Sequence, residues 1–520
     1  SMNLKNALRI YHTIKYLKWK QIKFQLLYRC KALYYKVPNP VDVKLEKLPI
    51  WKPVLFNSKS YENGTFCFLN VEQTFENTID WNFSDYGKLW TYNLNYFEFL
   101  NSKECRSKDG YELIKDYCLQ RNKLIDGLEP YPVSLRIMNW VKFLTFHQIN
   151  DSYINGIIAN DAKILREHLE FHILANHLLE NIFALYMASI FLDDKVLYTK
   201  SLKLLKDELN EQILKDGGHF EQSPMYHQII LYRLLDVINF NICNKIDIDI
   251  LLISKVKKML SWLEKISFSN GDIPYINDAA PDIAPTTVEL LNYAKYLDIN
   301  YLQLPLSDSG YRKVNTSNYE VVVDVANIAS NYQPGHLHSD SLQFIMYSKG
   351  RPLFVETGTS TYEKNKLRNY QRSSAAHNTV AVGGRNFYDV WGGFRVGKRS
   401  ELKLLEDRDY KIKAELNLFF GGTHHRSFEF LKKTLVIKDR ITFKYNVPHE
   451  AHFHIDYSRN VDKGTQENTF IVDNNILISF KHFTSIQLQK YNQSIGFNKT
   501  KEASKIVVTF ANQLKTTVEL

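Results

Sequence analysis

Apolar residues recur at intervals of three and four through the middle of the chain, from about Gly110 to Leu297. This spacing places them on one face of successive helices, and the connections between the helices are short and polar. Helices that follow one another without intervening strands predict a helical bundle, a solenoid or an α/α toroid. The helices are expected at 134–148, 161–196, 198–215, 225–243 and 249–267.

The pattern changes between residues 300 and 315, after which short β-rich segments replace the helical spacing. These segments are rich in Val, Ile, Phe, Tyr and Thr, and turn-like stretches separate or interrupt them. The combination predicts an antiparallel β-sandwich that follows the helical domain, with a boundary near residue 310. The strands are expected at 319–325, 341–348, 378–382, 410–419, 430–436, 440–446, 468–480 and 505–511.

The N-terminal residues 3–36 have the pattern of one or two basic amphipathic helices. Such helices attach to a membrane surface or a partner, or they pack on their own protein with a solvated basic face. The segment has no uninterrupted apolar core and no small-residue cleavage site, so it is not a secretory signal. We therefore expect the cytoplasm or the cytoplasmic membrane face, or export if a signal preceded this sequence.

Composition narrows the class of partner. The 520 residues are 44% hydrophobic and 23% charged, as in soluble globular proteins, and Lys plus Arg exceed Asp plus Glu by 66 − 56 = 10. A basic balance favours nucleic acid, anionic lipid or an acidic polysaccharide. No nucleic-acid motif appears, so nucleic acid is not expected. The five cysteines are odd in number and lack metal-ligand spacing, which predicts reduced thiols.

Two histidines, His336 and His338, stand just before a predicted strand. In an extended chain, residues two apart point to the same face. The pair is therefore a metal half-site, a base beside a metal ligand, or two loop histidines with surface hydrogen bonds.

Further metal-binding residue types follow on the next segments. Glu356 and His377 lie on neighbouring predicted strands, and with His338 they are able to bind Zn²⁺ or a similar ion. A ligating histidine usually holds its second ring nitrogen in a hydrogen bond, for which Asp340 or Asn378 is available.

A helix start is predicted in the segment Gly217–His227. Ser223 and Pro224 have the residue types of an N-cap and a first helical residue. Tyr226 follows in the first turn, where the helix dipole favours a lowered pKa. It is an acid or base, or a core tyrosine with a satisfied hydroxyl.

Polar residues also interrupt an apolar helical stretch at 176–181. Asn176 and Glu180 are four residues apart, and His177 and Glu180 are three apart, so both pairs share a helix face. They form a functional site or an internal polar network between helices.

At these residues the chain resembles the heparinase II/III family of polysaccharide lyases. The resemblance covers roughly residues 85–400, and its blocks occur in the family's order. The matching blocks are Asn176-His177-Leu178-Leu179-Glu180-Asn181, Gly218-His219-Phe220-Glu221-Gln222-Ser223-Pro224-Met225-Tyr226-His227, Gly335-His336-Leu337-His338-Ser339-Asp340-Ser341, Lys349–Gly358 and Arg372-Ser373-Ser374-Ala375-Ala376-His377-Asn378-Thr379.

The resemblance implies a multidomain α and β fold: an N-terminal incomplete α/α toroid followed by a C-terminal antiparallel β-sandwich. The expected domains are a basic helical lead-in at 1–85, the toroid at 86–310 and the sandwich at 311–520. The implied reaction is β-elimination of a uronic-acid glycoside in an acidic polysaccharide. A base takes the weakly acidic C5 proton, an acid protonates the leaving O4, and a third group neutralises the carboxylate.

By the same resemblance, Tyr226 and His336 are base and acid in an order that depends on the C5 configuration. Asn176 or His177 holds the substrate carboxylate. The implied metal ligands are His338, Glu356 and His377. The ion is a structural Zn²⁺ or other divalent cation, although the family more often has Asp where this chain has Glu356. No organic cofactor is implied.

Five further residues are predicted at the substrate. Glu180 is expected to contact it, and Glu221 and Arg372 are expected to contact it or to support the residues that do. Trp90 and Asn95 belong to an aromatic and amide cluster, Trp90–Phe97, of a composition that suits sugar-stacking clefts and ordinary cores alike.

Two other functions remain open. A glycoside hydrolase on an α/α toroid needs two carboxylates across a cleft, for which Glu180, Glu221, Asp272 and Asp278 are available. A non-catalytic glycan-binding or scaffold protein is the other alternative. For the lyase, the missing signal and the basic helices favour a role in capsule, exopolysaccharide or O-antigen biosynthesis or turnover. Heparan-like, alginate-like and hyaluronan-like polymers are equally compatible, and the oligomeric state is open.

Overall fold

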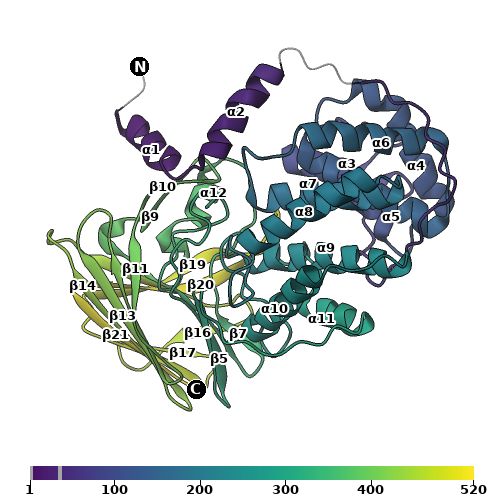
Figure 1. Cartoon of the computed structure of the whole chain (residues 1–520). Helices are drawn as coiled ribbons and strands as arrows, with labels where there is room; N and C mark the ends of the chain where they lie inside the picture. Colours follow the sequence, from purple (N-terminus) through teal and green to yellow (C-terminus); the bar gives the residue numbers. More distant parts are fainter. Residues whose placement is uncertain (1–3, 33–37) are drawn as a thin grey trace.

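The computed structural model describes residues 4–32 and 38–520 (Figure 1). A helical domain occupies one side and antiparallel sheets occupy the other, in the predicted order along the chain. The helices of the first domain are α3 (Lys88–Tyr96), α4 (Ser107–Gln120), α5 (Pro130–His147), α6 (Ser152–Glu167), α7 (Ala175–Phe191), α8 (Lys195–Gln212), α9 (Pro224–Cys243), α10 (Ile250–Ile266) and α11 (Thr287–Tyr296), with 3-10 turns at Glu98–Asn101 and Arg121–Lys123.

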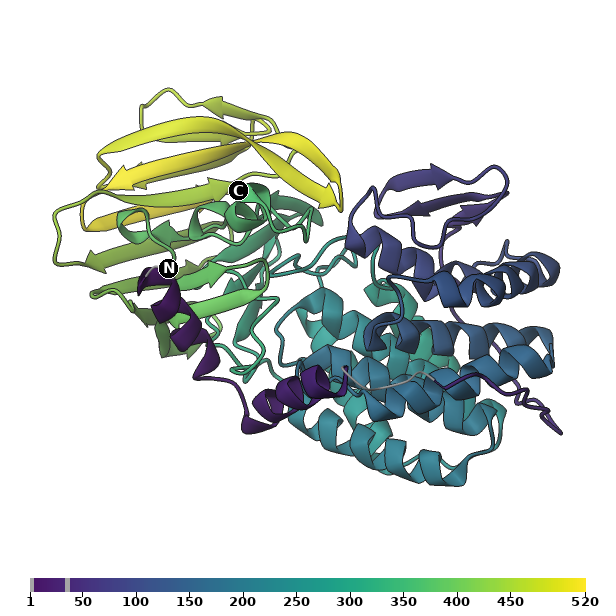
Figure 2. The ribbon, with the colours of Figure 1, turned by 90° about the horizontal axis from the view of Figure 1, so that it is seen from above.

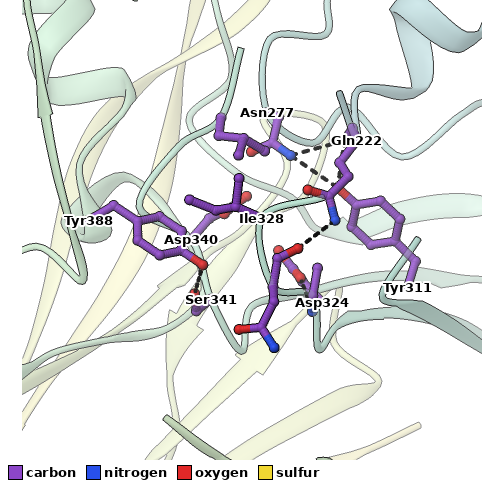
Figure 3. A pocket seen from close by; sticks show the side chains of 11 residues that line it. Gln222, Asn277, Tyr311, Asp324, Ile328, Asp340, Ser341 and Tyr388 are labelled. Atoms are coloured by element: carbon purple, nitrogen blue, oxygen red, sulfur yellow. Dashed lines mark hydrogen bonds between the residues drawn. The ribbon is translucent and has the colours of Figure 1, made fainter. Parts of the chain in front are cut away.

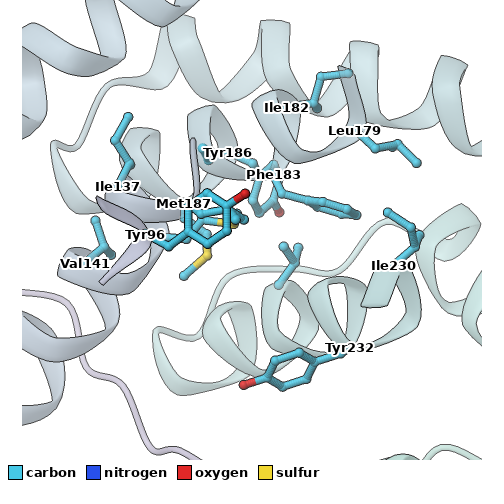
Figure 4. Packing of buried hydrophobic residues seen from close by; sticks show 14 of the residues in the cluster. Tyr96, Ile137, Val141, Leu179, Ile182, Phe183, Tyr186, Met187, Ile230 and Tyr232 are labelled. Carbon is cyan, nitrogen blue, oxygen red and sulfur yellow. The ribbon is translucent and has the colours of Figure 1, made fainter. Parts of the chain in front are cut away.

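The core of the helical domain lies between α5, α7 and α9 (Figure 4). Leu179, Ile182 and Phe183 of α7 are fully buried there and pack with Val141 and Ile230 of the two neighbouring helices. A helix that is apolar on almost every side belongs in the centre of a domain. This explains why α7, which also carries polar residues at its start, lies inside and not on the surface.

The helix expected at 161–196 is two helices, α6 and α7, separated by a loop at 168–174. Leu174 and Ala175 have left-handed backbone angles, with φ of 66° and 56°, which no continuous helix contains. The start of α9 is as predicted. The Ser223 side chain accepts from the backbone N–H of Tyr226, and Pro224 is the first helical residue.

A pair of N-terminal helices, α1 (Leu4–Ile14) and α2 (Trp19–Lys31), bridges the two domains. Figure 2 shows α1 against the β domain and α2 along the helical domain. The Arg9 guanidinium lies 2.6 Å from the Asp389 carboxylate on a hairpin of the β domain. Phe24 packs on Phe171 with ring centroids 4.7 Å apart. We call α1 and α2 together the N-terminal strap.

One buried side chain of the strap reaches both domains. The Gln21 amide donates to the carbonyl of Ile173, before α7, at 3.2 Å and to that of Tyr332, in a β-domain loop, at 3.3 Å. Only 3% of Gln21 is exposed, so water competes little for these bonds. Beyond the strap, a small unpredicted sheet fills part of the lead-in: β1 (Tyr61–Glu62), β2 (Thr65–Phe68) and β3 (Val71–Thr74).

The β domain contains an eight-stranded sheet, two four-stranded sheets and a hairpin, with antiparallel pairing throughout these strands. Phe344, Phe428 and Phe453 from different sheets meet in one core. In sheet order, the strands are β11 (Glu401–Arg408), β12 (Lys411–Asn417), β13 (Thr423–Phe430), β14 (Thr434–Thr442), β21 (Gln513–Glu519), β18 (Ile476–Lys481), β17 (Thr469–Val472) and β16 (Val461–Lys463); β19 (Ser485–Gly496), β20 (Lys499–Phe510), β15 (His449–His454) and β8 (Val380–Ala381); β4 (Tyr311–Asn315), β5 (Tyr319–Asp324), β6 (Phe344–Ser348) and β7 (Arg351–Phe354); and β9 (Tyr388–Trp391) with β10 (Arg395–Arg399). A short helix, α12 (Lys366–Gln371), follows β7.

Most predicted strands coincide with observed ones, and three do not. The segment 440–446 runs past the end of β14 at Thr442. The segment 430–436 straddles the turn between β13 and β14, and 468–480 is a hairpin of β17 and β18. All five cysteines are free thiols, as expected. Among the described residues, no helix combines the length and apolarity that a membrane crossing requires.

Candidate active site between the two domains

The predicted site residues converge from loops that are held in unusual backbone conformations. Ala175, Gln222 and Asn277 have φ of 56°, 60° and 59°, and each adjoins a residue of the site. Non-glycine residues in this region cost about 1–3 kcal/mol each. Such conformations persist only where surrounding contacts impose them, so the packing between the domains fixes the shape of the site.

Tyr226 and His336 face each other across the domain junction. Their rings stack with centroids 3.9 Å apart and planes inclined by 26°. The Tyr226 hydroxyl lies 3.0 Å from the hydroxyl of Tyr362, which the sequence did not single out. Burial, and then the neighbouring Tyr362, raise the pKa of Tyr226 well above its usual value. Tyr226 is therefore held as the neutral phenol.

A buried carboxylate, Asp278, organises the two histidines of the Gly335–Asp340 motif. It lies 2.9 Å from Nδ1 of His336 and 2.8 Å from Nε2 of His338. Arg368 donates to it with both terminal nitrogens, one of them at 2.7 Å. Burial alone would raise the pKa of Asp278, but Arg368 and the histidines hold it well below its usual value. With Nδ1–H of His336 bonded to Asp278, Nε2 carries the lone pair.

Asn176 and Glu221 lie on the other side of His336. Glu221 accepts from the backbone N–H and the side-chain amide of Asn176, at 2.9 and 2.8 Å, and so caps the start of α7. The Asn176 amide nitrogen and the second Glu221 oxygen each lie 3.5 Å from Nε2 of His336. Glu221 therefore supports both residues, which is one of its two predicted roles.

His177 has different partners from Asn176. Its ring packs on Tyr131 with centroids 4.4 Å apart, and its Nδ1 lies 3.2 Å from Glu170. A third of its side chain is exposed. Although burial lowers the pKa of His177, the Glu170 carboxylate more than compensates and raises it. The ring is therefore a partly exposed group that gains positive charge readily.

The predicted metal ligands His338, Glu356 and His377 come together in the interior. Nδ1 of His338 lies 3.1 Å from Nε2 of His377, and Glu356 oxygens lie 4.0 and 3.5 Å from these two nitrogens. Ligands about 2.1 Å from a tetrahedral Zn²⁺ are about 3.4 Å apart, so the spacing fits one ion. Burial raises the pKa of Glu356 well above its usual value and lowers that of His338 to about 4.

The remaining hydrogen bonds of these residues also fit a cation. His338 uses Nε2 for Asp278, and His377 uses Nδ1 for the carbonyl of Ser373 at 2.6 Å. Each facing nitrogen then presents a lone pair, and lone pairs 3.1 Å apart repel unless a cation lies between them. One Glu356 oxygen has no hydrogen-bond partner within the part of the chain that the structure describes.

The outer hydrogen bonds correct one prediction, because neither Asp340 nor Asn378 holds a ligating histidine. The Asn378 amide donates to two backbone carbonyls. Asp340 instead lines a small cavity with Asp324 and Tyr388 (Figure 3). Burial raises the pKa of Asp324 to about 7 and that of Asp340 well above its usual value. Burial therefore favours the protonated forms of these two carboxyls.

The structure contradicts substrate contacts for Trp90 and Asn95, because both side chains are core. Trp90 is 1% exposed, and its indole N–H donates to the carbonyl of Val71. The Asn95 amide donates to backbone carbonyls and accepts from the Tyr117 hydroxyl at 2.7 Å, with no exposed surface. The aromatic cluster joins the small N-terminal sheet to the helical domain.

Glu180 and Arg372 are also buried in the interior, which contradicts their predicted substrate contacts. Glu180 is buried and pairs with Arg233 at 3.1 Å inside the helical domain. Arg372 is fully buried and donates twice to the carbonyl of Leu337, between His336 and His338. Arg372 thereby fixes the backbone of the histidine motif, which is the supporting role predicted as its alternative.

A helical domain followed by antiparallel sheets is the architecture expected of a toroid joined to a β-sandwich. The model of the heparinase II/III N-terminus matches residues 132–300, and that of the heparinase II/III-like C-terminal region matches 302–519. These matches together cover most of the chain, which therefore belongs to the heparinase II/III family.

Relatives of known name support this assignment. A heparin-sulfate lyase of Pedobacter heparinus is 22% identical over 373 residues, which are 64% of this chain and 54% of that protein. One of Bacteroides stercoris is 25% identical over 213 residues, 36% of this chain and 31% of that protein. The chain thus spans about half or less of these curated relatives. The crystal structure of heparinase III matches with a TM-score of 0.67 at 14% identity, covering 96% of this chain and 92% of that one. The likeness confirms the predicted fold class.

Proposed function

We propose that the protein is a lyase that cleaves a uronic-acid-containing acidic polysaccharide by β-elimination. The observation that carries this proposal is the stacked pair of Tyr226 and His336, with the Asn176 amide 3.5 Å from the free nitrogen of His336. An acid, a base and a carboxylate-binding donor are the three groups that elimination needs. The heparin-sulfate lyase relatives support a glycosaminoglycan as the class of substrate.

We assign the proton acceptor to His336 and the proton donor to Tyr226. Nε2 of His336 takes the C5 proton, the C4–C5 double bond forms, and the C4–O4 bond breaks as the Tyr226 hydroxyl protonates O4. The charge gained by His336 is stabilised by Asp278 on one side and Glu221 on the other. The raised pKa of Tyr226 keeps its proton available, and Tyr362 is placed to return it.

We assign the substrate carboxylate to Asn176, not to His177. Asn176 adjoins His336, and its side-chain amide is a neutral donor that lies 3.5 Å from Nε2 of that ring. His177 faces Glu170 and Tyr131 instead. A protonated His177 would suit a neighbouring acidic sugar of the same polysaccharide.

We also propose that His338, Glu356 and His377 hold a structural divalent cation, with Zn²⁺ as the best fit to two imidazoles and a carboxylate. Its chemistry when bound is to neutralise these buried groups. His338 and His336 both bond to Asp278. A cation that fixes the His338 ring would therefore also help to fix the His336 ring through this carboxylate.

The test is a screen of acidic polysaccharides for new ultraviolet absorbance from unsaturated uronates. Tyr226→Phe and His336→Ala should each lower the rate at least about 100-fold. Tyr186→Phe is the matched control, because this buried hydroxyl bonds Asn241 in the helical core. New reducing ends without absorbance would indicate hydrolysis and overturn the proposal. Full activity in both variants would overturn the roles.

A further inference from the structure

The N-terminal strap carries a separate property that the proposed chemistry does not use. Residues 1–41 contain nine of the basic residues and no Asp or Glu, while the whole chain has a net charge of +10. Almost the entire excess of positive charge is therefore concentrated in this segment. The nine are Lys5, Arg9, Lys15, Lys18, Lys20, Lys23, Arg29, Lys31 and Lys36.

The strap also exposes large apolar side chains, between 46% and 74% of each being accessible. At 100° per residue, the three on α1 fall within an arc of about 120° and the three on α2 within about 100°. The opposite faces carry the contacts to the protein, such as Gln21 and Phe24. The exposed residues are Leu8, Tyr11 and Ile14 on α1 and Trp19, Leu26 and Leu27 on α2.

Basic residues flank these apolar faces. Lys15, Lys23 and Arg29 are exposed, and no acidic group lies within ion-pair distance of them in residues 4–32 and 38–520. Lys20 instead holds its ammonium 3.9 Å from the ring centroid of Phe171 in the helical domain. Other basic residues fasten the strap, as Lys18 does by pairing with Glu211. The strap is thus divided into a side that binds the protein and a side that is apolar and cationic.

We propose that this outer side of the strap binds the surface of an anionic lipid bilayer, with α1 and α2 lying in the interface. Trp and Leu on one face with Lys and Arg beside them is the pattern of helices that bind in this way. Each Lys or Arg near an anionic surface adds attraction, and the apolar side chains enter the acyl boundary. Both helices lie at the periphery, at the top of the molecule in Figure 1 and toward the viewer in Figure 2.

Two other occupants fit the observations less well. An acidic polysaccharide would pair with the lysines, but it offers no hydrocarbon in which Leu8, Ile14, Leu26 and Leu27 could be buried. A second copy of this chain, related by a two-fold axis, would bring two strongly basic straps together, and their repulsion would oppose association. A bilayer satisfies both the charge and the apolar surface.

The proposal is tested by sedimentation of the full chain with vesicles of phosphatidylcholine, with and without phosphatidylglycerol. Binding should require phosphatidylglycerol and weaken as salt is added. Lys15→Gln with Lys23→Gln should weaken binding roughly 30-fold at low salt. Trp19→Ser with Leu26→Ser and Leu27→Ser should weaken it at least about 100-fold. The control is Ile250→Ser with Leu302→Ser, two apolar residues outside the strap that are even more exposed, and it should have no effect.

Each outcome of these measurements either supports or overturns the bilayer proposal. No sedimentation with anionic vesicles, or the same loss in the control variant, overturns the proposal. Retention on an acidic polysaccharide without vesicle binding assigns the strap to the glycan, and self-association that the triple variant removes assigns it to a second copy. Thermal unfolding of the variants should match the parent, since the changed side chains are exposed. Lyase activity on soluble substrate is scored separately, so failure of one proposal is distinguishable from failure of the other.

Discussion

Replacement of Asp278 by Asn tests the organisation of the site most directly. The change keeps the shape of the side chain but removes the charge that pairs with Arg368 and holds Nδ1 of His336. An Asn amide can donate to Nδ1, which would move the ring proton to Nε2 and block the nitrogen assigned as proton acceptor. We expect kcat/KM to fall about 10²–10⁴-fold for the folded variant.

The same change should destabilise the protein. Arg368 has no exposed side-chain surface and would keep its charge without a carboxylate partner. Breaking a buried ion pair in this way costs about 3–5 kcal/mol. Urea unfolding followed by circular dichroism measures this loss, and ultraviolet absorbance of the product, scaled to the folded fraction, measures the rate.

A second buried triad in the β domain provides the control. Asp439 binds Arg426 at 2.7 Å and Nε2 of His424 at 2.7 Å, with no exposure of these side chains. Asp439→Asn should cost similar stability but leave the rate per folded molecule unchanged. Wild-type kcat/KM in folded Asp278→Asn would refute the reasoning, as would an equal loss of rate in Asp439→Asn.

Further predictions address other residues. Glu356→Gln should weaken Zn²⁺ binding by more than the ~10–100-fold that loss of an outer hydrogen bond costs, and it should also lower the Tm. The Zn²⁺ bound per chain measures the first effect, and an unchanged metal content would argue against the ligand assignment. Asn95→Ala should lower the free energy of unfolding by about 1–3 kcal/mol, because the Tyr117 hydroxyl loses its acceptor, while KM stays constant. A raised KM would instead support the predicted contact between Asn95 and the substrate. Asn176→Ala should lower kcat/KM about 100-fold with little change in Tm, and an unchanged rate would move the carboxylate elsewhere. Burial alone would raise the pKa of Asp439, but ion pairing with Arg426 lowers this pKa to about 2, below the unfolded value near 3.9. The Asp439 carboxylate should therefore contribute about 2–3 kcal/mol to the free energy of unfolding above pH ~4, and this contribution should be lost as the pH falls toward 2. In urea unfolding, the difference in free energy between the parent and Asp439→Asn should shrink over the same pH range.

The helices and several site residues were predictable because their signals are local. The Ser223–Pro224 start of α9 and the apolar spacing of its body identify that helix directly. The spacing of His336 and His338 predicted that both rings lie on the same face, as on a strand. They lie in a loop, and Asp278 contacts both.

Other features depended on contacts between distant segments. Asp278 is 58 residues from His336 and 90 from Arg368, so no spacing marks it as the centre of the site. The polar content of Asn95 and Glu180 suggested a cleft, but each is satisfied by a partner in the helical interior. The strand expected at 430–436 failed because β-rich composition continues through the turn after β13.

Gln21 also bears on how far the two domains can move apart. Its amide joins Ile173, three residues before Asn176, to Tyr332, four residues before His336. Any hinge motion that separates Asn176 from His336 must stretch this bridge. The strap should therefore restrict the separation of the two domains, and the rate of that separation should depend partly on residues outside both of them.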